Sequence, residues 1–277
     1  MAQATILNNK VVVVTGGARG IGLATAAALH KSGAQVAIGD IDGLAVKDAG
    51  TGLGLDVYGE LDVTDHESFA GFLDQVERQL GPIDVLINNA GVFPVGKIVD
   101  ESDAETQRAI AINIYGVILG SKLAAQRMLP RGSGHIINIA SLAGVTHAPG
   151  MATYCATKHA VLGFTDAARA EVRGTGVTFS AVLPTLTNTE MIAGISGARG
   201  LKNAEPEDIA HAIIGLINKP KPRVAVTRIA GIVTASQKFM PGRAADALRR
   251  AFGLDHAFTD QVDVEKRKSY DERRNLS

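Results

Sequence analysis

Short runs of Val, Ile, Leu and Ala alternate along the chain with stretches in which apolar residues recur at helical spacing. The first pattern favours strands and the second favours helices. We expect strands at 11–14, 34–39, 56–62, 83–88, 134–140, 176–183 and 223–227. We expect helices at 20–32, 66–80, 102–128, 152–173 and 206–218.

The predicted strands are nearly continuous apolar runs rather than alternations of apolar and polar residues. Such runs are typical of strands buried on both faces, as in a parallel sheet flanked by helices. Because crossovers between parallel strands are right-handed, the pattern predicts a doubly wound α/β fold with a parallel sheet of about seven strands and helices on both faces. In this architecture ligands bind at the carboxyl ends of the strands.

Length and composition favour one domain. Of the 277 residues, 46% are hydrophobic and 20% are charged, which allows a sizeable core. The sequence shows no internal repeat and no low-complexity linker. We therefore expect a single domain over 1–277, with a core at 9–227 and a C-terminal helical extension at 228–277.

Charge and cysteine content argue against several functions. Lys and Arg total 28, as do Asp and Glu, so the chain lacks the basic excess typical of nucleic-acid binders. The one cysteine, Cys155, cannot form an internal disulfide or a thiolate cluster, which favours a reducing, cytoplasmic setting. The first residues do not resemble a signal peptide, and we expect no transmembrane segment. The histidines show no metal-ligand spacing, so we expect no metal.

A glycine-rich turn follows the first predicted strand and opens the first predicted helix. It reads Thr-Gly-Gly-Ala-Arg-Gly-Ile-Gly over 15–22. Gly16, Gly20 and Gly22 allow a tight turn and a close approach of the backbone to a pyrophosphate, which the helix N-terminus also favours. Arg19 and Ile21 lie in the same turn. Any strand-to-helix turn can use glycine, so the motif alone also fits a purely structural turn.

Asp40 stands 18 residues after Gly22, at the end of the second predicted strand. A carboxylate there can accept hydrogen bonds from the adenosine ribose of a dinucleotide, and it would repel a 2′-phosphate. Asp42 adds a second negative charge nearby. We therefore expect NAD. NADP is the less favoured alternative, for which Arg19 is the evidence, since a basic residue can bind a 2′-phosphate.

Tyr154 and Lys158 are four residues apart on a predicted helix, so their side chains share one face. Ser141 precedes them, just past an apolar strand. An ammonium group about 4 Å from a phenol favours the phenolate by on the order of 4 kcal/mol at an effective dielectric of ~20, or roughly three pKa units. The pair predicts a tyrosine that acts as a general acid/base, although alone it also fits a packed tyrosine and a solvated lysine.

Taken together and in this order, the motifs resemble those of the short-chain dehydrogenase/reductase family, in its short single-domain branch. The resemblance rests on TGGARGIG at 15–22, NNAG at 88–91, Asn113, Ser141 and Tyr154-x-x-x-Lys158, and it covers roughly 9–227. It implies a Rossmann fold and a dehydrogenase that transfers a hydride between a nicotinamide cofactor and its substrate.

The resemblance implies roles at the matching positions. Tyr154 is expected to be the general acid/base, Ser141 to hydrogen-bond the substrate oxygen, and Lys158 to hold the nicotinamide ribose and lower the tyrosine pKa. Asn113 is expected to position a water in a proton relay, or else only to bend its helix. The expected cofactor-binding residues are Gly16, Arg19, Gly20, Ile21, Gly22, Asp40, Asp62, Val63, Asn89, Ala90, Gly91, Tyr154, Lys158, Pro184, Thr187 and Thr189. Thr185 stands where the family commonly has a glycine.

The substrate is expected to be apolar. Segment 185–205 combines glycines with apolar side chains, which suits a lid over an apolar substrate. The expected substrate contacts are Phe93, Leu142, Met151, Leu186 and Met191. We expect a hydrophobic secondary alcohol or its ketone. The alternative is a non-catalytic dinucleotide-sensing or scaffold protein on the same fold. The family also implies a homotetramer or homodimer, formed through the helices at 102–128 and 152–173.

Residues 228–277 break the alternation of strands and helices. Segment 229–240 is apolar, 243–252 looks helical, and 263–277 mixes both charge signs. Asp263 and Arg267 are spaced to pair across one helical turn. We expect a packed helix and a solvated extension. The alternatives are a cap over the substrate site, a contact with a partner subunit, and a membrane-surface anchor at 229–240.

Overall fold

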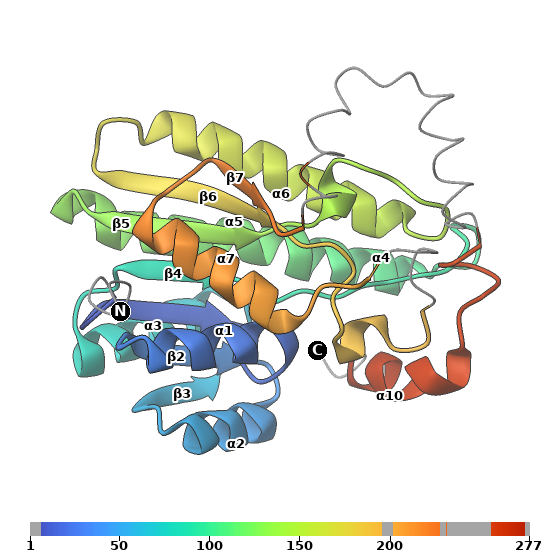
Figure 1. Cartoon of the computed structure of the whole chain (residues 1–277), viewed down its shortest axis with the longest axis horizontal. Helices are drawn as coiled ribbons and strands as arrows, with labels where there is room; N and C mark the ends of the chain where they lie inside the picture. The colour runs from blue at the N-terminus through green and yellow to red at the C-terminus, as the bar shows by residue number, and fades with distance from the viewer. Residues whose placement is uncertain (1–6, 196–201, 228–230, 232–255, 275–277) are drawn as a thin grey trace.

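The computed structural model describes residues 7–195, 202–227, 231 and 256–274 (Figure 1). Within these residues, seven parallel strands form one sheet in the order β3-β2-β1-β4-β5-β6-β7. The strands are β1 Val11–Thr15, β2 Gln35–Asp40, β3 Val57–Glu60, β4 Val85–Asn88, β5 Gly134–Ile139, β6 Val177–Leu183 and β7 Arg223–Ala225. The doubly wound parallel sheet predicted from the sequence is confirmed.

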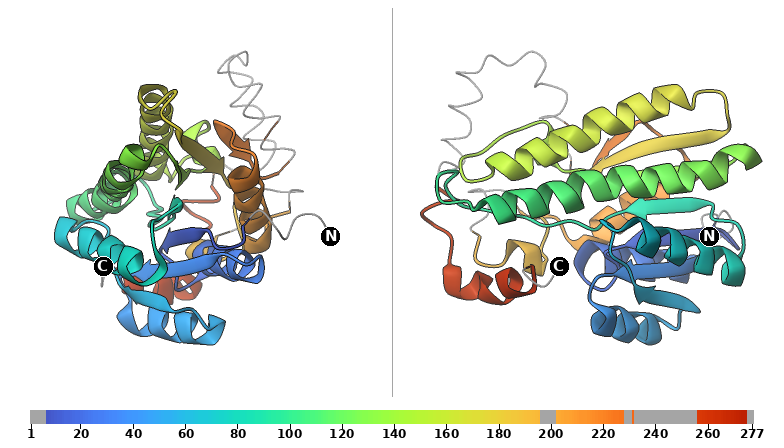
Figure 2. Two further views of the ribbon diagram at one scale, coloured as in Figure 1. Left: turned by 90° about the vertical axis from the view of Figure 1, so that its left-hand side faces the viewer. Right: turned by 180° about the vertical axis from the view of Figure 1, so that it is seen from behind.

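Helices cover both faces of the sheet (Figure 2). On one face lie α1 Gly20–Lys31, α2 Gly43–Leu53 and α7 Pro206–Asn218; on the other lie α3 His66–Leu80, α5 Val117–Met128 and α6 Ala152–Glu171. β1 contributes to both cores, because successive strand residues point to opposite faces. Val11 and Val13 belong to one core, and Val12 and Val14 belong to the other.

The strand order reverses at β1. This strand pairs with β2 on one side and β4 on the other, and the chain crosses from β3 back to β4. Open α/β sheets bind ligands in the crevice outside the carboxyl ends of the strands at such a point. The glycine-rich turn after β1 and segment 89–91 after β4 both lie there.

The helix predicted over 102–128 is interrupted. α4 Asp103–Ile110 and α5 are joined by a π-helical turn, Ala111–Gly116. Single π turns occur frequently at functional sites. By length and composition alone the run Asp103–Arg131 could cross a membrane, but 56% of its most apolar window is buried inside the fold. This run therefore packs its apolar side against the sheet, as a helix of one of the layers that cover it.

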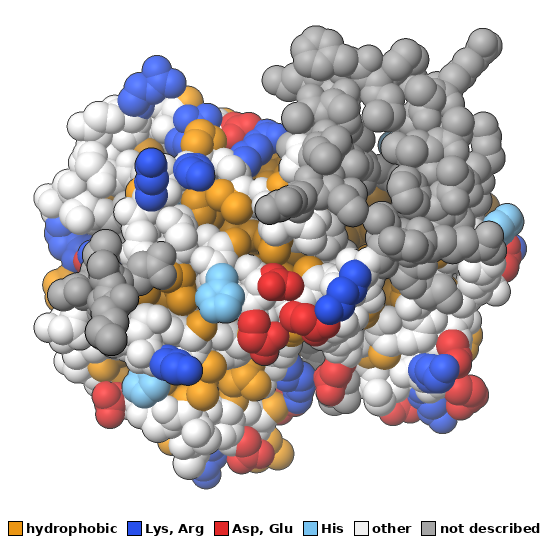
Figure 3. Space-filling model, viewed as in Figure 1, with side chains coloured by type: hydrophobic (Ala, Val, Ile, Leu, Met, Phe, Trp, Pro, Cys, Tyr) orange, Lys and Arg blue, Asp and Glu red, His pale blue; other side chains and the backbone are white. Residues whose placement is uncertain are grey.

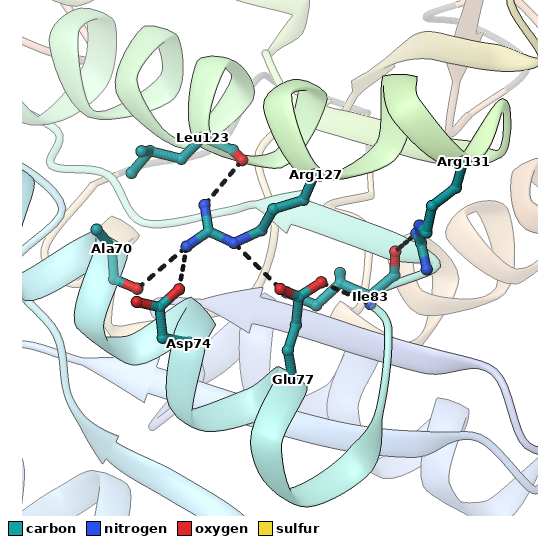
Figure 4. A network of polar contacts seen from close by, with 7 residues as sticks. All are labelled: Ala70, Asp74, Glu77, Ile83, Leu123, Arg127 and Arg131. Atoms are coloured by element: carbon teal, nitrogen blue, oxygen red, sulfur yellow. Dashed lines mark hydrogen bonds and ion pairs between the residues drawn. The ribbon is translucent and has the colours of Figure 1, made fainter.

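Arg127 of α5 joins this helix to α3 (Figure 4). Its guanidinium pairs with Asp74 and, at 3.4 Å, with Glu77. One turn further on, Arg131 donates to the carbonyl oxygen of Ile83, in the chain that leads into β4. These contacts fix α5 against α3 and β4, and so position the π-helical turn above the carboxyl end of β4.

Two elements differ from the sequence prediction on the β2–β3 side. The pattern missed α2, because glycines within its 11 residues obscure its apolar face. Asp42 caps this helix by accepting a hydrogen bond from the Ala45 amide at 3.0 Å. β3 is shorter than the 56–62 predicted, since it spans Val57–Glu60 only.

The C-terminal region departs further from expectation. Segment 243–252, and 229–240 apart from residue 231, lie outside the described residues. Helix α10 Val264–Arg274 packs against the loops after β4 and β6, so the prediction of a solvated extension is wrong for this helix. The predicted partners are also exchanged: Asp263 pairs with Lys266 at 3.1 Å, and Arg267 pairs with Asp271 at 3.3 Å.

Candidate active site

A cavity of about 630 Å³ lies at the carboxyl ends of the strands around β1 and β4. Most residues predicted for the site line it: Gly16, Arg19, Gly20, Ile21, Asp40, Asp62, Val63, Asn89, Ala90, Gly91, Phe93, Ser141, Met151, Tyr154, Lys158, Pro184, Leu186, Thr187, Thr189 and Met191. Cavities of this size typically bind a cofactor or a small ligand.

Three predicted residues do not line the cavity. Gly22 packs against the backbone oxygen of Gly16. Asn113 is fully buried behind the wall. Leu142 donates its backbone amide to the Pro184 carbonyl at 2.8 Å, and so joins the loops after β5 and β6. Their places in the structure are therefore supporting ones.

The glycine-rich turn needs glycine at two of its positions. Gly16 has a φ of 64°, and a Cβ there would lie 2.8 Å from the Cα of Ala90. A Cβ at Gly22 would lie 2.0 Å from the oxygen of Gly16. These contacts bring the turn directly against segment 89–91 and against α1, which leaves the start of α1 facing the cavity.

The first turn of α1 has the character of an anion site. Among the described residues, no side chain caps this helix, and its first turn carries no acidic residue. The first amides of a helix have no intrahelical partner and carry partial positive charge. The open helix start beside Gly16 and Gly20 therefore fits the pyrophosphate of a dinucleotide.

Asp40 ends β2 at the rim of the same cavity. One carboxylate oxygen accepts from the Ala18 amide at 3.1 Å, and the other accepts from the Asp42 amide at 3.2 Å. A carboxylate has about four acceptor positions, so two remain for further donors. The geometry fits a carboxylate that accepts hydrogen bonds from ribose hydroxyls.

Arg19 is paired inside the turn. Its guanidinium binds the carboxylate of Asp42, and its Nε lies 4.0 Å from Glu190. The hydrogen bond from Arg19 holds the pKa of Asp42 below its usual value. The positive charge of Arg19 is therefore balanced by two neighbouring carboxylates.

Thr15 and Asn89 join the ends of β1 and β4. The hydroxyl of Thr15 accepts from the amides of Asn89 at 3.0 Å and Ala90 at 3.1 Å. The side-chain amide of Asn89 donates in return to the carbonyls of Thr15 at 2.9 Å and Gly16 at 3.0 Å. This reciprocal pairing satisfies the backbone at the switch point and holds the cavity floor.

Tyr154 lies in the first turn of α6 and packs on Phe93, with ring centroids 4.4 Å apart. Burial raises the pKa of the Tyr154 hydroxyl above its ordinary value, and a hydrogen bond with Ser141 acts in the opposite direction. The hydroxyl of Ser141 also accepts from the Ala143 amide at 3.1 Å. Tyr154 is thus a buried phenol hydrogen-bonded with Ser141, and burial acts against the lowering of its pKa that the resemblance assigns to Lys158.

Lys158 lies one helical turn after Tyr154 on α6. Its Nζ donates to the carbonyl oxygen of Ile139 at 3.0 Å and lies 5.6 Å from the centroid of the Tyr154 ring. The ammonium therefore lies beside the Tyr154 ring and is held by a backbone carbonyl. Burial lowers the pKa of Lys158 itself to about 8.

Asn113 lies in the π-helical turn and braces the chain that follows β4. It accepts from the Val92 amide at 2.8 Å, and it donates to the Val92 carbonyl at 2.9 Å and to Thr157 at 3.2 Å. A Cβ at Gly91 would lie 3.1 Å from Oδ1 of Asn113 and 3.7 Å from Nζ of Lys158. Asn113 and Lys158 therefore converge on one glycine of the cavity wall.

The loop after β6 forms the opposite wall. The Thr187 hydroxyl donates to the Thr185 carbonyl at 3.0 Å, and the Thr189 hydroxyl donates to the Thr187 carbonyl at 3.3 Å. Thr187 also pairs with Ala204, which closes the base of the predicted lid at 185–205. Residues 196–201 of that lid lie outside the described residues.

The end of the cavity beyond Tyr154 is apolar. Phe93, Met151, Leu186 and Met191, all predicted as substrate contacts, belong to one hydrophobic cluster with Tyr154. Such a wall favours an apolar ligand.

Several polar lining residues, Thr64 among them, were not predicted from the sequence. Gln107 and Arg108 come from α4, Glu190 from the loop after β6, and Tyr270 from α10. The hydroxyl of Tyr270 accepts from the Phe93 amide at 2.8 Å, although the two residues are 177 positions apart. Contacts at such separations are set by tertiary structure and leave no local pattern.

Residues 10–199 match the family described as short chain dehydrogenase. The chain belongs to this family. The resemblance drawn from the sequence motifs is thereby confirmed.

Relatives and a solved structure agree with the assignment. The 2-(S)-hydroxypropyl-CoM dehydrogenase 3 of Xanthobacter autotrophicus is 38% identical, over 76% of this chain and 91% of that protein. Probable oxidoreductase EphD of Mycobacterium tuberculosis is 33% identical over 76% of this chain, but the match spans only 40% of EphD. A short-chain dehydrogenase/reductase from Burkholderia phymatum, solved in complex with NAD, has the same fold (TM-score 0.76, 24% identity, 83% of this chain and 92% of that chain).

Proposed function

We propose that this short-chain dehydrogenase is an NAD-dependent oxidoreductase that interconverts a hydrophobic secondary alcohol and its ketone. The observation that carries the proposal is that one cavity joins Tyr154, Ser141 and Lys158 to the open start of α1. A dinucleotide-binding end and an acid/base end therefore share one cavity, which a dinucleotide sensor or scaffold would not need.

The chemistry is divided between the cofactor and the chain. A nicotinamide dinucleotide, when bound, supplies or accepts the hydride. Tyr154 holds the proton at its hydroxyl oxygen, from which it can protonate the oxygen of a ketone under reduction. Ser141 is placed beside it to hydrogen-bond that oxygen. In the direction of alcohol oxidation, Tyr154 must first lose its proton, which the positive charge of Lys158 favours.

The preference for NAD over NADP rests on charge at the end of β2. Asp40 keeps acceptor capacity for ribose hydroxyls, while Arg19 is already paired with Asp42 and approached by Glu190. A 2′-phosphate would meet carboxylates without a cation to balance it. The complex with NAD of the Burkholderia neighbour favours the same class of cofactor.

The choice of substrate rests on the apolar cluster around Phe93 and Met191. The name of the Xanthobacter relative describes a dehydrogenase of a hydroxypropyl compound, which favours a secondary alcohol here as well. The fold itself fixes no substrate, so the cavity wall is the guide.

The test combines cofactor binding with turnover. NADH and NADPH are titrated by fluorescence, and NAD⁺ reduction is then screened over apolar secondary alcohols with wild type, Tyr154→Phe and the matched control Tyr115→Phe, whose side chain is exposed. We expect tighter binding of NADH, turnover by wild type and Tyr115→Phe, and turnover reduced at least about 100-fold in Tyr154→Phe. Turnover unaffected by Tyr154→Phe, or tighter binding of NADPH, would contradict the proposal.

A further inference from the structure

Arg267 of α10 is buried, with 3% of its surface exposed, although arginine is mostly a surface residue. Its guanidinium donates to the carbonyls of Met191, at 3.0 Å, and Phe93. It stacks against the rings of Phe93 and Tyr270, 5.7 Å and 4.7 Å from their centroids. Its Nε pairs with Asp271 at 3.3 Å. One side chain therefore joins α10 to both loops of the apolar end of the cavity.

Two glycines with left-handed backbone conformations make close contacts with the segment that carries α10. Gly194 has a φ of 73°, its carbonyl accepts from the Asp263 amide at 2.8 Å, and a Cβ there would lie 2.2 Å from the Asp263 oxygen. Gly150 has a φ of 80°, and its Cβ would lie 2.2 Å from the oxygen of Phe258. Phe258 is 3% exposed and packs edge-on against Phe93 at 6.1 Å. The loops are shaped to receive residues 256–274.

Tyr270 is the residue by which α10 reaches the cavity, since it alone among the described residues of this helix lines it. Its hydroxyl is fixed by the Phe93 amide, and its ring is fixed by Arg267. Exposed charged side chains of both signs lie over α10, at the lower right of Figure 3. The helix thus has a charged outer face and an inner face that ends in one aromatic ring at the cavity.

We propose that residues 256–274 form a substrate-selecting cap, in which Tyr270 contacts the substrate and limits its length, while Arg267 is the positioning residue that holds the cap closed. The cap lies outside residues 10–199, which match the family. The inference rests on the proposed function and deepens it. A fixed aromatic ring at the apolar end admits short apolar ketones and alcohols and excludes long ones.

The physical basis is the rigidity of the contacts. Tyr270 has few rotatable bonds and is held at both its ring and its hydroxyl, so it cannot turn aside for a longer ligand. If Arg267 is removed, two buried carbonyl oxygens lose their donor, which favours opening of the cap. The size limit therefore depends directly on Tyr270 and indirectly on Arg267.

The first experiment measures ligand binding without turnover. 2-Butanone, 2-hexanone, 2-octanone and 2-undecanone are titrated into the enzyme–NADH complex and followed by NADH fluorescence. The variants are Tyr270→Ala, Tyr270→Phe and Tyr270→Trp, with Lys268→Ala on the exposed face of α10 as the matched control. The quantity compared is the Kd for 2-undecanone divided by the Kd for 2-butanone.

We expect Tyr270→Ala to lower this ratio about tenfold or more, and Tyr270→Trp to raise it, because pocket volume decides between apolar ligands that differ by methylenes. Tyr270→Phe, which keeps the ring but loses the hydroxyl anchor, should lower the ratio less than Tyr270→Ala, and Lys268→Ala should leave it within about twofold. The proposal is overturned if Tyr270→Ala and Tyr270→Trp leave the ratio unchanged or shift it in the same direction. It is also overturned if wild type binds none of the ketones.

The second experiment measures docking of the cap by hydrogen exchange. In Arg267→Gln we expect faster exchange in peptides that contain Phe93, Met191 and 256–274, with the glycine-rich turn unchanged and the Kd of NADH within about twofold. Arg267→Lys should restore part of the protection, and Lys268→Ala should resemble wild type. Unchanged exchange in Arg267→Gln would overturn the positioning role.

Failure of the proposed function gives a different result. If the ketones bind with the expected dependence on Tyr270 but no alcohol or ketone is turned over, the cap proposal is supported and the catalytic proposal is wrong. If turnover depends on Tyr154 but the ratio of the two ketone Kd values does not change when Tyr270 is substituted, the catalytic proposal is supported and the cap proposal is wrong.

Discussion

Lys158 donates to the carbonyl oxygen of Ile139 at 3.0 Å, behind the face of the Tyr154 ring. Burial lowers the lysine pKa from its ordinary 10.5 to about 8. The unfolded chain therefore binds more protons between pH 8 and 10.5, so stability rises with pH across that window. Below pH 8 the folded state carries the full free-energy cost of burying the charged Lys158, about 3 kcal/mol. Burial of this charged lysine therefore costs stability, as expected if the residue is kept for its role in the proposed reaction.

The variant Lys158→Met tests this. We expect turnover to fall at least about 100-fold, while the melting temperature at pH 7 changes by less than about 4 °C, because relief from the buried charge offsets the donor lost by Ile139. Calorimetry and NAD⁺ reduction give the two quantities. Lys122→Met, at an exposed position of α5, is the control. A large drop in melting temperature would show that Lys158 is a structural residue.

Gly22→Ala should abolish dinucleotide binding or folding. The added Cβ would lie 2.0 Å from a backbone oxygen, which the helix cannot avoid without moving away from the turn. We expect the Kd of NADH to rise at least about tenfold, or the melting temperature to fall by more than about 4 °C. Gly71→Ala, in α3, is the matched control, because a Cβ there meets nothing within 4 Å. That variant should be unchanged or more stable by about 0.5–1 kcal/mol.

Asp42→Asn should weaken the preference for NADH. Asparagine still caps α2 but no longer neutralises Arg19, whose guanidinium then has charge to offer a 2′-phosphate. We expect the ratio of the NADPH Kd to the NADH Kd to fall about tenfold, measured by fluorescence titration. Asp48→Asn, exposed on the same helix, should leave the ratio unchanged. An unchanged ratio in Asp42→Asn would mean that Arg19 does not control cofactor choice.

His135 of β5 should make the protein sensitive to acid. Burial lowers its pKa from 6.5 to about 4, so the folded state holds it neutral. Between those values the unfolded chain binds more protons, and stability falls as the pH drops from 6.5 towards 4, by up to about 3 kcal/mol. Above pH 6.5 His135 is neutral in both the folded and the unfolded chain, so it causes no loss of stability there.

His135→Gln cannot titrate and can still reach the Ser180 hydroxyl, which contacts the His135 ring at 2.8 Å. Urea unfolding at pH 7 and pH 4.5 should show a smaller loss of stability on acidification than wild type. His30→Gln, at an exposed position of α1, should behave as wild type. Equal acid sensitivity of His135→Gln and wild type would assign the effect to other groups.

The parallel sheet and the catalytic set could be predicted because both leave local marks. β1, β4, β5 and β6 are short, mainly apolar runs, and a glycine, an amide or a hydroxyl stands within two residues of the end of each. Ser141, Tyr154 and Lys158 were named from order and spacing, and the structure brings them to one cavity. The π-helical turn left no such mark, since the residues of Ala111–Gly116 also suit an α-helix.

The tyrosine pKa and the role of α10 could not be predicted for a different reason. The first depends mainly on how deeply the Tyr154 hydroxyl is buried, which a spacing of four residues does not fix. In α10, nine of the 11 residues are polar or charged, a composition that predicts a solvated helix. Arg267 and Tyr270 are buried there only because the loops around Phe93 and Met191 offer carbonyls and rings. The composition of α10 gives no sign of these partners, because they lie in other parts of the chain.

The contact between Tyr270 and Phe93 also sets an order of events in synthesis. The two residues are 177 positions apart, so the dinucleotide half of the sheet emerges from the ribosome well before its cap. During that interval the apolar loop around Phe93 lacks the contacts of Phe258, Arg267 and Tyr270, and this part of its surface is open to chaperones or to association with other chains. A translation product that stops before residue 256 would keep the nucleotide turn but lose the contacts of Phe258 and Tyr270 with this loop, and we expect its abundance in the cell to be lower than that of the full chain.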